Sequence, residues 1–331
     1  MRTWMASLIL LAVPAFAETA PMAMPMPAAT SDGTTVIVVV GAPGEEEYGT
    51  VFTEETGRWE KVVAQAGAKL RTIGLTAAGT GATSDFNLLK QAIEAEPTEG
   101  RGELWLVFIG HGTFDGKEAK FNLRGPDLAA TELALWLQPF HRPLAVIDTS
   151  SASAPFLNKL AGANRVVITA TRSGFEQNYA RFGRYLSEAI SDPQGDIDKD
   201  GETSLLEAFL SASARLTEFY KTEGRLATEH PLLDDNGDGL GTPPDWFRGV
   251  RAIKKAANGA TADGLRAQQF VLVRSAAEQK LSPAVRAQRD ELELALGKLR
   301  DSKAKLAEDE YYRRLEALLL ELAKLYETPA S

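Results

Sequence analysis

The chain has 331 residues, no cysteine, and a formal net charge of −9 at pH 7, from 36 Lys and Arg against 45 Asp and Glu. The absence of cysteine excludes disulfide bonds, thiolate metal sites and a thiol nucleophile. The acidic balance argues against a nucleic-acid partner, because phosphate binding requires a concentrated basic surface. Zinc is disfavoured as well, since His111, His141 and His230 show no ligand-like spacing.

The first 17 residues have the features of an export signal. Arg2 supplies a positive charge, residues 4–14 form an apolar run, and Ala15-Phe16-Ala17 fits a small-x-small cleavage site. We therefore predict a signal peptide at 1–17 and an exported product, periplasmic or extracellular. The run is shorter than the roughly 20 apolar residues that span a bilayer, and no later stretch is longer, so we expect no membrane anchor.

A flexible linker is predicted for residues 18–33, which are rich in Ala, Pro and Met and show no periodicity. Strand-like and helix-like stretches then alternate with short connections. Buried strands are predicted at 34–40, 104–109, 144–147 and 165–170, a further strand at 69–75, and helices at 52–66, 85–96 and 127–137. This alternation predicts a three-layer α/β/α domain over 34–250, built on a mainly parallel sheet with helices on both faces.

Polar motifs follow two consecutive strands of this sheet. Ile109-Gly110-His111-Gly112 ends one strand, and the run Asp148-Thr149-Ser150-Ser151-Ala152-Ser153 follows the next. In parallel sheets, ligands and catalytic residues collect beyond the carboxyl ends of the strands. We therefore expect the two motifs to be neighbours.

In this arrangement residues 34–190 resemble the legumain- and caspase-type peptidases. That family places a His-Gly after one buried strand and an Asp-Ala-Cys-x-Ser-Gly-like run after the next, and the stretch 167–174 resembles the following strand, whose exit borders the substrate pocket. The resemblance implies that His111 handles protons, Gly112 offers an oxyanion N–H, and Ser150 occupies the nucleophile position. Pocket residues implied in the same way are Asp148, Ser151, Thr171 and Arg172. Ser151 or Ser153 takes the nucleophile position if the alignment shifts.

Serine in place of cysteine removes the reactive group of that family. A serine hydroxyl needs an oriented base to attack, and the family does not hold its histidine in a triad. We therefore expect an exported, degenerate peptidase homologue that acts as a binding or scaffolding module for an unidentified protein or peptide partner. The alternatives are an active peptidase or other hydrolase that uses a Ser150–His111 pair, and a calcium-gated adaptor.

Two acidic loops match the spacing of EF-hand calcium loops. The first, at 196–207, offers oxygen ligands from Asp196, Asp198, Asp200, the Glu202 carbonyl, Ser204 and Glu207. The second, at 234–245, offers them from Asp234, Asn236, Asp238, the Leu240 carbonyl, Thr242 and Asp245. Hard oxygen donors at these positions favour calcium, and we predict it as a cofactor. Binding should be weaker in the second loop, which ends in Asp and contains Pro243-Pro244.

The remainder is predicted to be a connector at 251–280, with a strand at 270–273, and a helical hairpin at 281–328. Ser282-Pro283 suits a helix start, and a break near Ala307 separates two helices. Leucine-rich stripes run along both: Val285, Leu292, Leu296 and Leu299, then Leu315, Leu318, Leu322 and Leu325. We expect the stripes to pack on each other and on the main domain, as in a short antiparallel coiled coil. An exposed partner-binding surface is the alternative.

Overall fold

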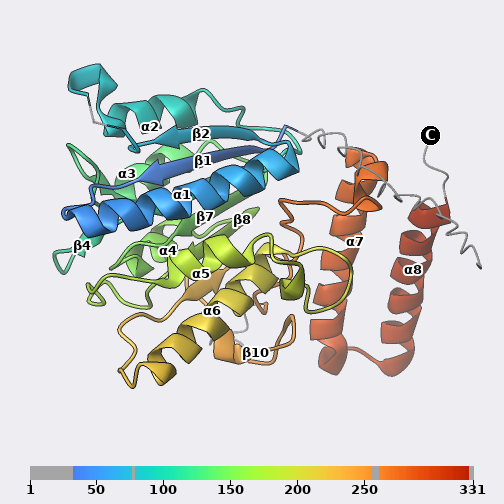
Figure 1. Ribbon diagram of the computed structural model, residues 1–331. Coiled ribbons are helices and arrows are strands. Elements are labelled where there is room, and N and C mark those ends of the chain that lie inside the picture. The colour runs from blue at the N-terminus through green and yellow to red at the C-terminus, as the bar shows by residue number, and fades with distance from the viewer. Residues whose placement is uncertain (1–32, 77–78, 255–260, 328–331) are drawn as a thin grey trace, which may run out of the picture.

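The computed structural model describes residues 33–76, 79–254 and 261–327 (Figure 1). A six-stranded sheet forms the centre, in the strand order β2-β1-β3-β7-β8-β9. The first five strands are parallel, and only β9 runs antiparallel to its neighbour β8. Their bounds are β1 (Thr35–Val40), β2 (Lys69–Ile73), β3 (Leu104–Ile109), β7 (Leu144–Asp148), β8 (Arg165–Thr169) and β9 (Leu232–Asp234).

Helices cover both faces of the sheet. One face carries α1 (Glu46–Ala66), α5 (Phe182–Ala189) and α6 (Leu205–Thr222), and the other carries α2 (Asp85–Glu94), α3 (Ala130–Leu137) and α4 (Ala154–Leu160) (Figure 1). The protein therefore has the expected three-layer α/β/α architecture. A small antiparallel sheet of β4 (Gly112–Phe114), β5 (Ala119–Phe121) and β6 (Leu128–Ala129) lies between β3 and α3 in the chain.

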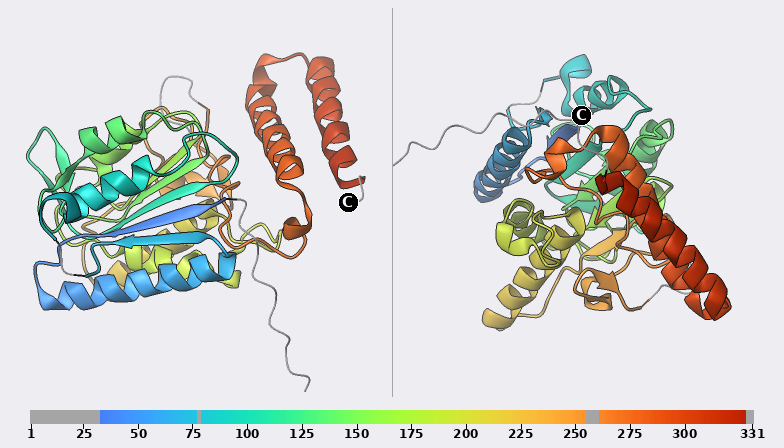
Figure 2. Two further views of the ribbon diagram at one scale, coloured as in Figure 1. Left: turned by 90° about the horizontal axis from the view of Figure 1, so that it is seen from above. Right: turned by 90° about the vertical axis from the view of Figure 1, so that its right-hand side faces the viewer.

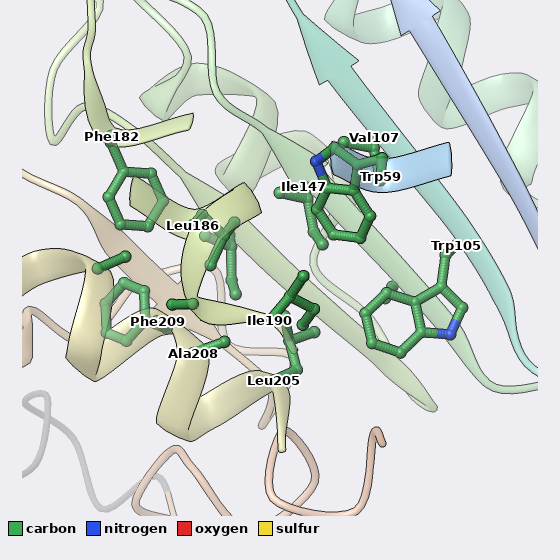
Figure 3. Packing of buried hydrophobic residues seen from close by; sticks show 14 of the residues in the cluster. Trp59, Trp105, Val107, Ile147, Phe182, Leu186, Ile190, Leu205, Ala208 and Phe209 are labelled. Carbon is green, nitrogen blue, oxygen red and sulfur yellow. The ribbon is translucent and has the colours of Figure 1, made fainter. Parts of the chain in front are cut away.

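Two apolar cores explain the unbroken strand sequences. In β1, Val36 and Val38 face the helices α1, α5 and α6, whereas Ile37 and Val39 face α2, α3 and α4. Successive strand side chains point to opposite faces, so a strand buried on both faces has no polar position. Figure 3 shows the first core, where Trp59 and the α5 and α6 side chains pack over Val107 and Ile147 of the sheet.

The sequence pattern locates the long elements well and the short ones poorly. Strand β3 has the predicted bounds, and Ser84 caps α2 by accepting a hydrogen bond from Asn87 N at 3.4 Å. Helices α4 and α5 and strands β4, β5 and β9 were not predicted, because elements this short carry too little periodicity. The strand expected at 270–273 is wrong: Phe270 is buried there, but its carbonyl accepts Leu205 N at the start of α6, at 2.8 Å.

The C-terminal hairpin consists of α7 (Pro283–Ser302) and α8 (Glu308–Glu327). Ser282 caps α7 by accepting Val285 N at 3.3 Å. The hairpin stands beside the amino ends of the parallel strands (Figures 1 and 2). Helix α7 faces the main domain, where Gly297 lies against Leu265. Among the described residues no helix is long and apolar enough to cross a bilayer, and the expected signal peptide and linker lie outside those residues, apart from Gly33.

Candidate functional site

The two polar motifs meet at the carboxyl edge of the sheet. Gly112 follows β3, and its N–H donates to Ser151 Oγ at 3.1 Å, while that hydroxyl donates to the Gly112 carbonyl at 3.2 Å. The approach is so close that a Cβ on Gly112 would lie 2.2 Å from the Ser151 carbonyl oxygen and 2.9 Å from Ser150 Oγ. The predicted neighbourhood of the two motifs is therefore confirmed.

His111 sits in an aromatic cage beside this edge. Its ring contacts Tyr48 at 4.7 Å, Phe52 at 5.3 Å and Tyr179 at 5.9 Å between centroids. Nε2 lies 3.2 Å from the Pro43 carbonyl oxygen, which only accepts, so this nitrogen carries the hydrogen and donates. Burial lowers the pKa of His111 below its usual range, which disfavours the charged imidazolium.

Ser150 is fully buried, and its hydroxyl faces a carboxyl group. Ser150 Oγ donates to Asp148 Oδ1 at 2.6 Å, and Ser150 N donates to the same oxygen at 3.0 Å. Burial raises the pKa of Asp148 to about 6, although both bonds from Ser150 lower it. The second carboxyl oxygen of Asp148, Oδ2, is buried and has no hydrogen-bond partner in the described part of the chain.

The other serines at this edge are also engaged. Ser151 bonds to Gly112 as described, and Ser153 Oγ bonds with Thr171 Oγ1 at 3.2 Å and accepts Ala170 N at 3.1 Å. All three serines of the motif are at most 2% exposed. Across residues 33–76, 79–254 and 261–327, no hydrogen bond joins His111 to any of them. In the described part of the chain, His111 is therefore not paired with a serine of this motif, and the Ser150 hydroxyl is paired with Asp148 instead.

The pocket residues expected from the resemblance separate into a buried and an exposed group. Thr171 is buried and accepts Ala154 N at 3.1 Å, so it shapes the backbone beneath the site. Arg172 is exposed, and its guanidinium pairs with Glu176 at 3.4 Å.

Sequence reasoning missed Glu176 and His230. The Glu176 carbonyl accepts Ala152 N at 2.8 Å, and its carboxylate contacts His230 Nδ1 at 2.6 Å. Glu176 thereby ties three loops together: the one after β7, the one after β8, and the one before β9. Ala152 has a φ of +55°, a strained conformation for a residue with a side chain, and its bond to Glu176 helps hold it. No motif signals these contacts, because they join separate loops.

Comparisons with known proteins found similar solved structures. The Drosophila initiator caspase Dronc matches at 12% identity and a TM-score of 0.41, over 66% of this chain and 84% of that one. Caspase-1 from Spodoptera frugiperda matches at 10% identity and 0.40, over 65% and 92%. Raptor from Chaetomium thermophilum matches at 8% identity and 0.31, over 51% of this chain and 18% of that one. No family model matches the sequence, and no curated protein does.

The first acidic loop gathers its carboxylates at the start of α6. Asp196, Asp198 and Glu207 each offer an oxygen, and these atoms lie within 4.8 Å of one another. Glu207 is buried, and Ser204 caps α6 in a reciprocal bond with it, Ser204 N donating to Glu207 Oε2 at 2.8 Å. Oε1 accepts Ile197 N at 2.7 Å, which folds the loop back onto the helix.

The donor set of this loop fits a hard cation. Burial raises the pKa of Asp200, and the nearby carboxylates of Asp198, Glu207 and Asp196 raise it further. The Lys199 amine donates to the Asp196 backbone carbonyl at 2.5 Å. Gly201 has a φ of +92°, the turn that the sixth position of such a loop requires. Oxygen-only ligands under mutual repulsion are the donors that calcium prefers.

The second acidic loop differs from the first at its later ligands. Its early part is similar: Asp234 accepts Gly239 N at 2.7 Å, as Asp196 accepts Gly201 N at 3.1 Å in the first loop. Asp245, the expected last ligand, is exposed in the short helix η3 (Pro244–Trp246). Leu240, whose carbonyl was the expected backbone ligand, is exposed as well. Within the described residues, only the first loop brings three carboxylate ligands together.

A carboxylate from outside the second loop lies within it. Asp263 Oδ1 accepts Asp235 N at 2.9 Å and Asn236 N at 3.1 Å, and Oδ2 accepts the Thr242 hydroxyl at 2.5 Å. Burial, and then Asp263, raise the pKa of Asp234 to about 7. Asp263 could not be predicted from the sequence, since it follows the motif at a spacing that no EF-hand pattern includes.

Proposed function

We propose that this protein is an exported, non-catalytic module with a caspase-like fold, stabilised by calcium, that binds a protein or peptide partner. The observation that carries the proposal is the bond from Ser150 Oγ to Asp148 Oδ1, at 2.6 Å and away from solvent. A serine nucleophile needs its hydroxyl bonded to a base and open to substrate. Ser150 is fully buried, its hydroxyl donates to Asp148 and makes no bond with His111, and His111 Nε2–H donates to the Pro43 carbonyl.

Activity-based labelling tests the non-catalytic part. The protein should not react with a fluorophosphonate probe and should not cleave a peptide library that varies the residue before the scissile bond. The variant Ser150→Cys, measured in the same two assays, tests whether the geometry still supports a thiol nucleophile beside Gly112. Labelling of the natural protein at Ser150, abolished in His111→Ala, contradicts the proposal and favours the hydrolase that uses the Ser150–His111 pair.

The calcium part rests on the convergence of Asp196, Asp198 and Glu207 in the first loop. Calcium bound there would stabilise the junction of the loop with α6. The loop also contacts the connector: Gln268 Nε2 donates to Asp198 Oδ2 at 2.6 Å, and Ser275 N donates to Glu202 Oε1 at 2.5 Å. A cation in this loop would therefore also stabilise the connector that leads to the hairpin. Calcium in the second loop remains part of the proposal, with weaker affinity.

The surface at the carboxyl edge supports a protein or peptide partner. Phe175 is 75% exposed and stacks edge-on against Phe114, with ring centroids 5.2 Å apart. Exposed aromatic side chains that are fixed by neighbours are typical anchors of protein interfaces. The variant Phe175→Ser should weaken the recovery of the partner from an exported-protein fraction. Leu226→Ser, at a residue that is 91% exposed, is the control and should leave the recovery unchanged. Equal recovery with both variants would remove this face from the proposal.

A further inference from the structure

A cavity of about 520 Å³ lies between the amino edge of the sheet and helix α7. Its walls come from the turns that precede β3 and β7, the connector from Arg266 to Arg274, and the first half of α7. The hairpin meets the main domain here, beside the amino ends of the parallel strands (Figure 2). His111 and Ser150 follow the carboxyl ends of β3 and β7, at the opposite edge of the sheet. Small-molecule sites typically enclose about 300–1,000 Å³ and often lie at interfaces between domains.

Within the part of the chain that the structure describes, not every arginine that lines this cavity is paired with an acidic side chain. The charged groups of the lining are Arg101, Arg266, Arg274, Arg286, Glu103, Asp290 and Glu291. Glu103 is already satisfied, because Arg274 Nη2 donates to it at 2.8 Å and Trp105 Nε1 at 2.7 Å. Asp290 accepts both Nη2 of Arg289, at 2.9 Å, and Nε, at 3.1 Å, from outside the lining. Two of the three acids are therefore occupied by donors.

Arg266 is the cation left over in the wall. Its half-buried guanidinium makes no hydrogen bond with any residue that the structure describes. Burial lowers the pKa of Arg266, against the attraction of Asp235 and Asp290. The Asp235 carboxylate is hydrogen-bonded to backbone groups, since it accepts Gly264 N at 2.9 Å and Ala267 N at 2.8 Å. Arg101 is exposed and, among the described residues, has no ion pair either.

A guanidinium removed from water without hydrogen-bond acceptors is unfavourable, and an incoming anion supplies the missing acceptors. The same cavity has apolar surface beside the arginines. Phe270 lies in its wall, held edge-on to Trp105 at 5.7 Å between ring centroids, and Leu294 and Pro143 add to it. A ligand with one anionic group and one apolar part would match both.

We propose that this cavity binds a small organic anion, whose phosphate or carboxylate group contacts Arg266 and Arg101 and whose apolar part contacts Phe270 and Leu294. Such a ligand touches the main domain and α7 together, so its binding would also fix the hairpin in place. The ligand would contact no residue of the carboxyl edge or of the acidic loops, and the proposal is independent of the function proposed above.

Calorimetric titration of the whole protein tests it, with phenyl phosphate, benzoate and inorganic phosphate at constant ionic strength. Phenyl phosphate or benzoate should bind saturably with one site, and the tighter of the two identifies the anionic group. Inorganic phosphate should bind more weakly than phenyl phosphate, because it lacks the apolar part. Arg266→Gln should weaken the binding about tenfold or more, the usual effect of losing a charge-assisted hydrogen bond.

Two further variants make the result decisive. Arg300→Gln removes an exposed charge from α7 outside the cavity, and it should bind as the natural protein does. Ala287→Phe fills the cavity from α7 without changing its charge, and it should abolish binding. Circular dichroism establishes that each variant is folded. The absence of saturable binding to the natural protein overturns the proposal, and so does equal weakening in Arg266→Gln and Arg300→Gln.

Discussion

Ser150 donates its hydroxyl hydrogen to Asp148, two residues earlier in the chain, over 2.6 Å. The hydroxyl that would have to attack a substrate is therefore directed into the sheet, toward a carboxyl group without solvent contact. Because Asp148 Oδ2 has no partner in the described part of the chain, the charged form of this carboxyl is poorly supported. The bond is thus a structural contact whose strength depends on pH.

Asp148 should make stability fall as pH rises. Its folded-state pKa of about 6 exceeds the ordinary value of 3.8, so the stability that it contributes is present below the ordinary value and is lost as pH rises through 6. Asp148→Asn keeps the acceptor for Ser150 and cannot ionise. Relative to this variant, the natural protein should lose up to about 3 kcal/mol between pH 4 and 8.

Urea unfolding of both proteins across that range measures the difference. Other groups whose pKa is raised in the folded state, such as Glu55 with a pKa of about 8, titrate equally in both proteins. Their contributions therefore cancel in the difference between the two unfolding free energies. A difference in unfolding free energy that stays constant with pH would show that Asp148 is already ionised at the acid end.

Gly112 should be intolerant of any side chain. A Cβ there would lie 2.2 Å from the Ser151 carbonyl oxygen, which is backbone and can yield only if the loop after β7 moves. Gly112→Ala should therefore destabilise the protein by about 2 kcal/mol or more, as overpacking does. Gly57→Ala is the matched control in α1, with nothing within 4 Å of its Cβ, and should stabilise by about 0.5–1 kcal/mol. Thermal and urea unfolding compare the two, and a neutral Gly112→Ala would contradict the close packing of the motifs.

Calcium should raise the melting temperature through the first acidic loop. Binding to the folded chain alone adds about 2.7 kcal/mol at one hundred times Kd. Asp198→Ala removes one of the converging ligands and should abolish most of the shift, whereas Asp309→Ala, on α8 outside both acidic loops, should leave it intact. Asp238→Ala should reduce the shift only slightly, in line with weaker binding in the second loop. Identical melting temperatures in calcium and in chelator would exclude the first loop as a site.

The leucine stripe of α8 should hold the hairpin together. Leu318 and Leu322 are half-buried, whereas Leu319 and Leu320 are 46% and 55% exposed. The double variant Leu318→Asp, Leu322→Asp should release α8 from α7 and expose the hairpin to protease. It should leave the unfolding of the main domain nearly unchanged, because α8 lies on the far side of α7 (Figure 1).

The variant Leu319→Asp, Leu320→Asp is the control for this experiment and should keep the hairpin resistant to protease. Limited proteolysis, with the fragments identified by mass, separates the outcomes. Early cleavage in the control, or none in the Leu318 and Leu322 variant, would place the packing face on the other side of α8.

The sequence alone determined the long elements and their layering. Strands β1 and β3 are unbroken apolar runs, and a run without polar positions is stable only where both faces of a sheet are covered. The same pattern predicts that Gly112 and Ser151 lie at one edge of the sheet, where the structure has them. The first acidic loop was readable for a similar reason, since the spacing of its ligands is local and Glu207 belongs to the same turn as its cap, Ser204.

The contacts that these side chains make depend on the tertiary fold. The sequence shows a serine near a histidine, but the rotation of each side chain follows from packing: Tyr48 and Phe52 cage His111, and the Asp148 carboxyl takes the Ser150 hydroxyl. Relations between distant segments were equally out of reach, such as the bond of Asp263 with Thr242 and the placement of Arg266 and α7 around one cavity. Periodicity reports which face of an element is buried, whereas the partner across a loop or an interface depends on how complete elements come together.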